Sequence, residues 1–242
     1  MATEAYRDGD ISTNTSQIDG RDGSIETQTV DGHEIMLLDG SRVYGRDDPE
    51  LGWFEHFNRR VLPLESGHMV LIDDFMVRAD RGTADVAEYF YTQPYEDVPD
   101  TSSCRASQTS IARTITDERI TLVPYCAGLD YAPAESAGQI IGTALSPGYF
   151  DDEGEVSFYD RLDDLNTKVR LAWHPDEPVS RDLRLFALLA APGEAALPDG
   201  GWTWDSDCAD DRCATLTVDG ETAVRLGFSD DGTRYALVSV SD

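Results

Sequence analysis

A predicted hairpin within residues 54–77 constrains the fold more than any other stretch of the chain. Residues 59–64 predict one strand, and residues 69–73 predict the strand that returns beside it. The segment between them contains Ser66-Gly67, and Gly accommodates the positive φ that a short hairpin loop needs. The returning strand is apolar without alternation, which is typical of a strand buried on both faces. The chain is therefore expected to bury this strand between other elements.

The rest of the chain repeats this pattern of short β runs separated by turns rich in Gly and Asp. Asp31-Gly32 and Asp219-Gly220 each lie between two predicted strands and favour tight hairpin turns. Residues 181–191 have a composition that favours helix, yet they lie among strands, and we favour a buried strand there.

We therefore predict an all-β fold, an antiparallel β-sandwich of many short strands with little helix. Its length fits a single domain over residues 1–242. Residues 1 to about 23 are polar, with repeated Asp-Gly turns, and are the part that we expect to be loosely ordered.

The charge of the chain is strongly unbalanced. It has 47 acidic and 19 basic residues, a net charge of −28, and Lys168 as its only lysine. Frequent aromatic residues and apolar runs argue against acidic disorder. Carboxylates hold water and cations at high salt, where screening removes their mutual repulsion, so the composition indicates a salt-adapted protein from a high-salt environment. Such a surface would repel the phosphates of a nucleic acid.

Compartment and redox state stay open. No apolar run reaches the length of a membrane span, and the N-terminus lacks the features of a signal peptide, which indicates a cytoplasmic protein or a fragment of a longer one. Cys208 and Cys213 could close a small loop, and Cys104 and Cys126 could pair across a predicted hairpin. Two disulfides would instead indicate an oxidising compartment. The cysteine spacing does not fit a metal site, and we expect no metal and no cofactor.

Two groups of residues have chemistry that could serve a site. His56 precedes Asn58 and Arg59, so an imidazole, an amide and a cation gather there; the alternative is a strand residue satisfied by the backbone. Trp202 and Trp204 lie on one face of an extended strand, where they could stack on a sugar or simply pack. Adjacent aspartates in several turns could bind calcium, but the overall acidity favours solvated turns.

Three short motifs connect the chain to a known family. The first runs from His56 through Arg59 into a strand, a turn and a return strand that ends at Asp73. The second is residues 11–20, where Asn14 and a following Asp-Gly fit a His-Asn-Thr pattern with threonine in the place of the histidine. The third is residues 144–149 with residues 185–192 later. Together they resemble the C-terminal β-sandwich of heparinase II/III-like polysaccharide lyases.

This resemblance implies β-elimination on a uronate-containing polysaccharide. A base removes the proton next to the carboxylate, a second group neutralises the intermediate, and an acid protonates the leaving oxygen. His56 would match a catalytic position, and Asn14 and Arg59 would bind substrate, with Trp202 and Trp204 as further sugar contacts. The family places an α/α toroid before the sandwich, and no helical toroid is seen in this sequence. We therefore expect either a truncated gene product or a subunit that needs a separately encoded toroid as partner, and no activity from the chain alone.

A different class of function fits the same sequence. The chain could be a non-catalytic carbohydrate-binding or surface module whose likeness to the lyases is only architectural.

The charge imbalance predicts a dependence of stability on salt. We expect the melting temperature to fall below roughly molar salt, because the acidic groups then repel each other with little screening. Thermal unfolding at low and at molar sodium chloride measures this directly. A melting temperature that is the same in both would remove the salt-adapted interpretation.

Overall fold

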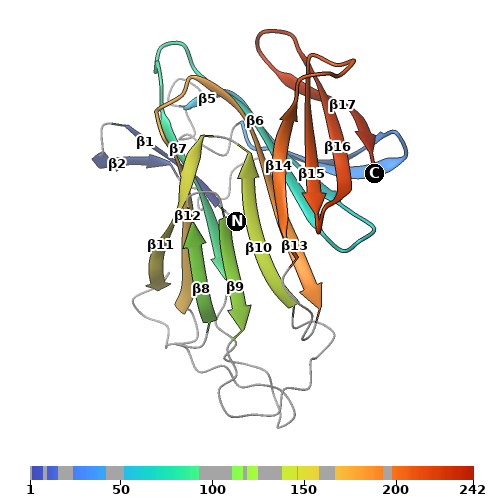
Figure 1. Cartoon of the computed structure of the whole chain (residues 1–242). Coiled ribbons are helices and arrows are strands. Elements are labelled where there is room, and N and C mark those ends of the chain that lie inside the picture. Colours follow the sequence, from blue (N-terminus) through green and yellow to red (C-terminus); the bar gives the residue numbers. More distant parts are fainter. Residues whose placement is uncertain are drawn as a thin grey trace, which may run out of the picture.

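The computed structural model consists of three antiparallel β-sheets (Figure 1). It describes residues 2–7, 10–15, 24–41, 52–92, 111–116, 119–124, 138–145, 147–157, 167–192 and 198–242. These ranges contain no helix, and so no helix that could span a membrane. The predicted all-β fold class is confirmed.

The strands have the following bounds. They are β1 (Ala2–Arg7), β2 (Asp10–Thr15), β3 (Ser24–Val30), β4 (His33–Asp39), β5 (Phe54–Pro63), β6 (Met69–Val77), β7 (Asp85–Thr92), β8 (Ile111–Thr116), β9 (Arg119–Pro124), β10 (Gly138–Leu145), β11 (Gly148–Ser157), β12 (Thr167–Pro175), β13 (Arg181–Pro192), β14 (Gly200–Asp205), β15 (Arg212–Val218), β16 (Glu221–Asp230) and β17 (Tyr235–Ser241).

The eight-stranded sheet is the central layer of the molecule. Its strand order is β3-β4-β5-β6-β13-β10-β9-β8, the five-stranded sheet has the order β11-β12-β7-β1-β2, and the four-stranded sheet has the order β14-β15-β16-β17. One apolar core joins β5, β6 and β13 to the four-stranded sheet. Two other cores join the same strands to the five-stranded sheet. The central strands are therefore covered on both faces.

Strand β6 shows why its sequence lacks alternation. Val70 and Ile72 lie in the core shared with the four-stranded sheet. Leu71 and Phe75 point the other way, into the cores shared with the five-stranded sheet. A strand between two layers needs apolar side chains on both faces, and the predicted burial of this strand is confirmed.

The turns follow the residues that the sequence placed there. Asp31 and Gly32 have φ values of 49° and 91°, and Asp219 and Gly220 have values of 53° and 83°. Two successive positive φ angles define the tight hairpin turn whose twist matches that of the flanking strands. Gly67 in the central hairpin has a φ of 84°. These turns fix the pairing of β3 with β4, β15 with β16, and β5 with β6.

The remaining assignments agree in most places. Residues 181–191, whose composition favours helix, form strand β13 between β6 and β10. Strand β11 begins at Gly148 and pairs along its length with β12. In the segment that we expected to be loosely ordered, β1 and β2 pair with each other, and β1 pairs with β7.

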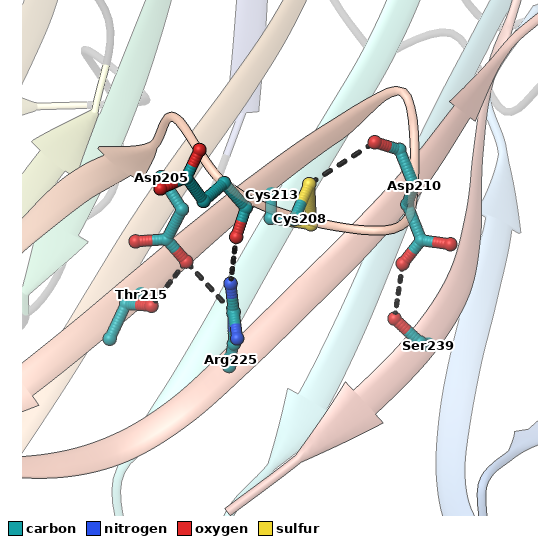
Figure 2. The surroundings of a disulfide bond; sticks show 8 residues. Asp205, Cys208, Asp210, Cys213, Thr215, Arg225 and Ser239 are labelled. Carbon is teal, nitrogen blue, oxygen red and sulfur yellow. Dashed lines mark hydrogen bonds and ion pairs between the residues drawn. A yellow bond between two sulfur atoms is a disulfide. The ribbon is translucent and has the colours of Figure 1, made fainter.

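A disulfide between Cys208 and Cys213 closes a loop beside the four-stranded sheet (Figure 2). Three hydrogen bonds tie this segment to the sheet, and the first runs from the Asp230 amide of β16 to Asp211 Oδ2 at 2.7 Å. Ser239 Oγ of β17 donates to Asp210 Oδ2 at 2.7 Å, and Arg225 Nη2 of β16 donates to the Asp207 carbonyl at 3.0 Å. A Cβ at position 227 would collide with the Asp210 carboxylate, so this close approach requires glycine there. The pairing of Cys104 with Cys126 lies outside the described residues.

The disulfide is expected to stabilise the chain mainly by restricting the unfolded state. The loop is short, so the chain-entropy relation gives a loss of about 2 kcal/mol when the bond is removed. We therefore expect the Cys208→Ser/Cys213→Ser variant to have a free energy of unfolding lower by that amount in urea titrations. A Cys104→Ser/Cys126→Ser background isolates the effect. If the Cys104→Ser/Cys126→Ser background is equally stable with and without Cys208→Ser/Cys213→Ser, the loop is held by its hydrogen bonds alone.

Candidate functional site

The central hairpin carries charged residues into the interior of the molecule on both faces of the eight-stranded sheet. Because side chains alternate along a strand, Arg59 and Asp73 face the five-stranded sheet, while Asp74 faces the four-stranded sheet. In the described part of the chain, seven polar or charged side chains are buried, each with at most 7% of its surface exposed. They are His56, Arg59, Arg60, Asp73, Asp74, Glu88 and Arg184.

Four of these residues form a group that we call the inter-sheet ion cluster: Arg59, Asp73, Arg184 and Glu88. Arg59, Asp73 and Arg184 are register partners across β5, β6 and β13, so they lie in one row on the same face. Glu88 comes from β7 of the facing sheet. The cluster contains two cations and two anions and therefore balances its own charge.

The Arg59 guanidinium is the centre of this cluster. Its Nε donates to Asp73 Oδ1 at 2.7 Å, and its Nη2 donates to Asp73 Oδ2 at 2.5 Å. The same Nη2 donates to Glu88 Oε2 at 2.5 Å. A bidentate bond within one sheet and a single bond to the other give a planar guanidinium three charge-assisted contacts.

Arg184 makes the second link between the two sheets. Its Nη1 donates to the Val86 carbonyl of β7 at 2.5 Å and lies 3.6 Å from Glu88 Oε1. Its guanidinium carbon lies 4.8 Å from the ring centroid of Phe75 and 4.6 Å from that of Trp173. Aromatic faces attract a desolvated cation, which partly replaces the water lost on burial.

A smaller contact lies on the opposite face of the central sheet. His56 Nε2 is 3.2 Å from Asp74 Oδ2, within ion-pair distance when the imidazole is protonated, although it makes no hydrogen bond of good geometry. Asp74 Oδ1 accepts a hydrogen bond from the Tyr235 amide of β17 at 3.0 Å. Asp74 thus connects the predicted catalytic histidine to the four-stranded sheet.

Arg60 is buried nearby with little compensation. Burial lowers the pKa of its guanidinium; the charges of Asp74 and Asp73 act in the opposite direction, and that of Arg234 lowers the pKa further. Among the residues that the structure describes, its Nε and Nη1 have no hydrogen-bond partner. This face of the hairpin thus carries a buried guanidinium whose nitrogens are only partly hydrogen-bonded.

The two predicted tryptophans have different environments. Trp202 is 9% exposed and belongs to the core beneath the four-stranded sheet. Trp204 is 38% exposed, and the Arg212 guanidinium lies 4.7 Å from its ring centroid. Trp204 lies at the end of its strand, outside the core, so only this indole is open to a ligand. The side chain of Asn14, on β2, lies outside the described residues.

The structure therefore brings His56 and Arg59 into one hairpin but directs them to opposite sheets. Sequence reasoning missed Glu88 and Arg184, which complete the cluster. A signal was present, because each is a charged residue within an apolar strand. Within the described ranges, no group of three or more His, Cys, Asp or Glu side chains could hold a metal ion.

Comparison with known proteins gives a likeness of fold. No family model matches the chain, and no curated protein matches it. Among solved structures, a mutant of heparan sulfate lyase HepC from Pedobacter heparinus superposes with a TM-score of 0.53 at 12% identity, over 83% of this chain and 27% of that chain. HepC itself superposes with a TM-score of 0.52 at 12% identity, over 89% of this chain and 28% of that chain. A heparinase III structure superposes with a TM-score of 0.50 at 11% identity, over 83% of this chain and 26% of that chain.

These values define how far the likeness reaches. At 11–12% identity the superposition shows a shared β-domain fold and carries no residue roles. The chain spans only 26–28% of the length of the chains in these three structures. The heparinase-like β domain expected from the sequence is thus found at the level of the fold.

The inter-sheet ion cluster predicts a large effect of removing one charge. Glu88→Gln removes the carboxylate that both buried arginines share and leaves Arg59 with Asp73 and Arg184 with Asp182 at 2.9 Å. We expect the loss of this buried partner to cost about 3 kcal/mol. Urea unfolding in molar salt measures the change. The control is Glu221→Gln, an exposed strand residue, for which we expect a change within about 0.5 kcal/mol. Equal changes in the two variants would contradict the role of the cluster.

Proposed function

We propose that this chain is the β-sandwich part of a heparinase-type polysaccharide lyase that cleaves a uronate-containing polysaccharide by β-elimination. The observation that carries the proposal is the likeness of its fold to the β domain of heparan sulfate lyase HepC, with a TM-score of 0.53. The sequence motifs around His56, Arg59 and Asn14 support it independently.

The reaction needs three groups around the sugar. A base takes the proton next to the uronate carboxylate, a cation or hydrogen-bond donor stabilises the charge that develops, and an acid protonates the leaving oxygen. We propose His56 for proton transfer, since its imidazole Nε2 lies 3.2 Å from the Asp74 carboxylate. We propose that Asn14 and Trp204 contact the substrate. Arg59 would support binding indirectly, by holding strand β5 in place.

Burial limits what these residues can do alone. His56 is 3% exposed and Arg59 is 7% exposed, so neither meets a polymer at the surface described here. We propose that catalysis requires a helical partner domain that supplies the rest of the site, as the short span relative to the neighbouring enzymes also suggests.

A second candidate function has its own supporting observation. Trp204 and Arg212 are exposed and in contact, whereas His56 is enclosed. A carbohydrate-binding module needs only such a surface and no buried acid–base group. The chain would then bind the polysaccharide without cleaving it.

The absorbance of the unsaturated uronate product distinguishes the two. The assay uses a panel of uronic-acid polysaccharides in high salt, with the chain alone and mixed with a helical protein encoded beside it. We expect product only in the mixture, and we expect His56→Gln to abolish it while His68→Gln, in the exposed turn of the same hairpin, retains it. Urea unfolding confirms that both variants fold. Binding without product in every mixture would favour the binding module.

A further inference from the structure

A ladder of arginine and aromatic side chains crosses one end of the four-stranded sheet. We call it the arginine–aromatic surface and define it as Trp204, Arg212, Tyr235 and Arg181. The Arg212 guanidinium lies 4.7 Å from the Trp204 ring centroid and 5.5 Å from that of Tyr235. The Arg181 guanidinium lies 3.8 Å from the Tyr235 ring centroid. Two cations and two rings therefore form one continuous stack.

The surface is assembled from elements far apart in the sequence. Trp204 lies at the end of β14, Arg212 begins β15, Tyr235 begins β17, and Arg181 begins β13 of the central sheet. The Tyr235 amide is anchored to the buried Asp74 carboxylate at 3.0 Å. The tyrosine that supports both arginines is thus fixed to the central hairpin.

The two arginines differ in how their charge is compensated. Arg181 Nη2 donates to Asp230 Oδ1 at 2.5 Å. Arg212 donates only a long bond of 3.4 Å to the Tyr235 hydroxyl, and within the described part of the chain no carboxylate lies at ion-pair distance from it. An exposed arginine without a carboxylate partner is notable in a chain with 47 acidic residues. Its remaining N–H groups are available to a ligand.

The available groups suit an anionic sugar. A guanidinium binds a carboxylate or a sulfate through two parallel hydrogen bonds, and an exposed indole offers an apolar face to a sugar ring. Stacking against two rings holds Arg212 in place, so less side-chain entropy is lost when a ligand binds. Within this surface the Asp230 carboxylate pairs with Arg181, and the charge of Arg212 also acts on it, so the two guanidinium groups outnumber this carboxylate.

We propose that the arginine–aromatic surface binds an anionic sugar unit, with Arg212 contacting its carboxylate or sulfate and Trp204 stacking on its ring. The inference names a binding surface separate from His56. It rests on the class of ligand in the proposed function and shares Trp204 with it.

Binding of size-defined heparan sulfate oligosaccharides tests the proposal. Calorimetric titration is done at the lowest salt at which each variant is folded. We expect Arg212→Gln to weaken binding at least tenfold, because a charge-assisted bidentate contact is lost. Arg212→Lys keeps the charge but not the fork and should give an intermediate loss. We expect Trp204→Ala to weaken binding about 3- to 10-fold.

Arg225→Gln is the matched control, because Arg225 is also an exposed arginine of the four-stranded sheet but is paired with Asp205 at 2.9 Å. We expect it to change binding less than twofold. Equal losses for Arg212→Gln and Arg225→Gln would overturn the proposal by showing a general effect of charge. Absence of binding to the unmodified chain would overturn it too.

Chemically altered oligosaccharides identify the anion that is bound. We expect carboxyl-reduced or desulfated forms to bind more weakly, according to which group Arg212 contacts, and undiminished binding of a sugar that lacks both would overturn the proposal. Lyase assays on the same samples keep the two proposals distinguishable. Binding that depends on Arg212 without any product supports this surface and contradicts the lyase function. If Arg212→Gln changes neither product formation nor binding, the result supports the lyase function and contradicts the binding role of this surface.

Discussion

The inter-sheet ion cluster is the interaction on which the arrangement of the layers depends. Arg59, Asp73 and Arg184 form a row across three neighbouring strands, and Glu88 meets them from the facing sheet. Burying four charges is expensive unless each is paired, so only one relative position of the two sheets satisfies the cluster. Apolar packing around it is far more tolerant of small displacements, since hydrophobic contact has no direction. We infer that the cluster specifies the docking of these sheets, and that the cores supply most of the stabilisation.

The use of arginine in place of lysine follows from this architecture. Arginine offers a planar fork and a face that stacks on aromatic rings, whereas lysine offers a strongly hydrated point charge. Arg59 uses the fork, and Arg184, Arg181 and Arg212 use the face. Much of the basic minority is therefore committed to buried or stacked positions. In the described part of the chain the buried acidic side chains are Asp73, Asp74 and Glu88, so the interior described here holds few of the groups behind the net charge of −28.

Much of the fold could be predicted because its determinants are local. The continuous apolar run of β6 predicts burial on both faces, and the Asp-Gly pairs predict the hairpins that the structure contains. Residues 181–191 show the limit of local composition: leucine and alanine favour helix, but pairing with β6 and β10 on either side makes this segment a strand.

The candidate site was harder to predict because alternation gives the face of a strand and not the layer that covers it. His56 and Arg59 could be selected by their chemistry, yet the sequence does not show that separate sheets enclose them. Trp202 and Trp204 share a face of β14. The apolar core covers Trp202 but ends before Trp204, so the first is buried and the second is exposed. Glu88 and Arg184 are far apart along the chain, so their meeting across two sheets depends on tertiary structure alone.

A double-mutant cycle between Arg59→Met and Glu88→Leu tests the central claim most directly. The free energy of unfolding of the two single variants, the double variant and the unaltered chain is measured by urea titration in molar salt. If the cluster couples the two sheets, each single variant takes one partner from a buried charge: Glu88 keeps only Arg184, or Arg59 keeps only Asp73. The double variant is then more stable than the sum of the single effects by at least about 1 kcal/mol. Additive effects within about 0.3 kcal/mol would show that the two charges do not interact, and would contradict the account.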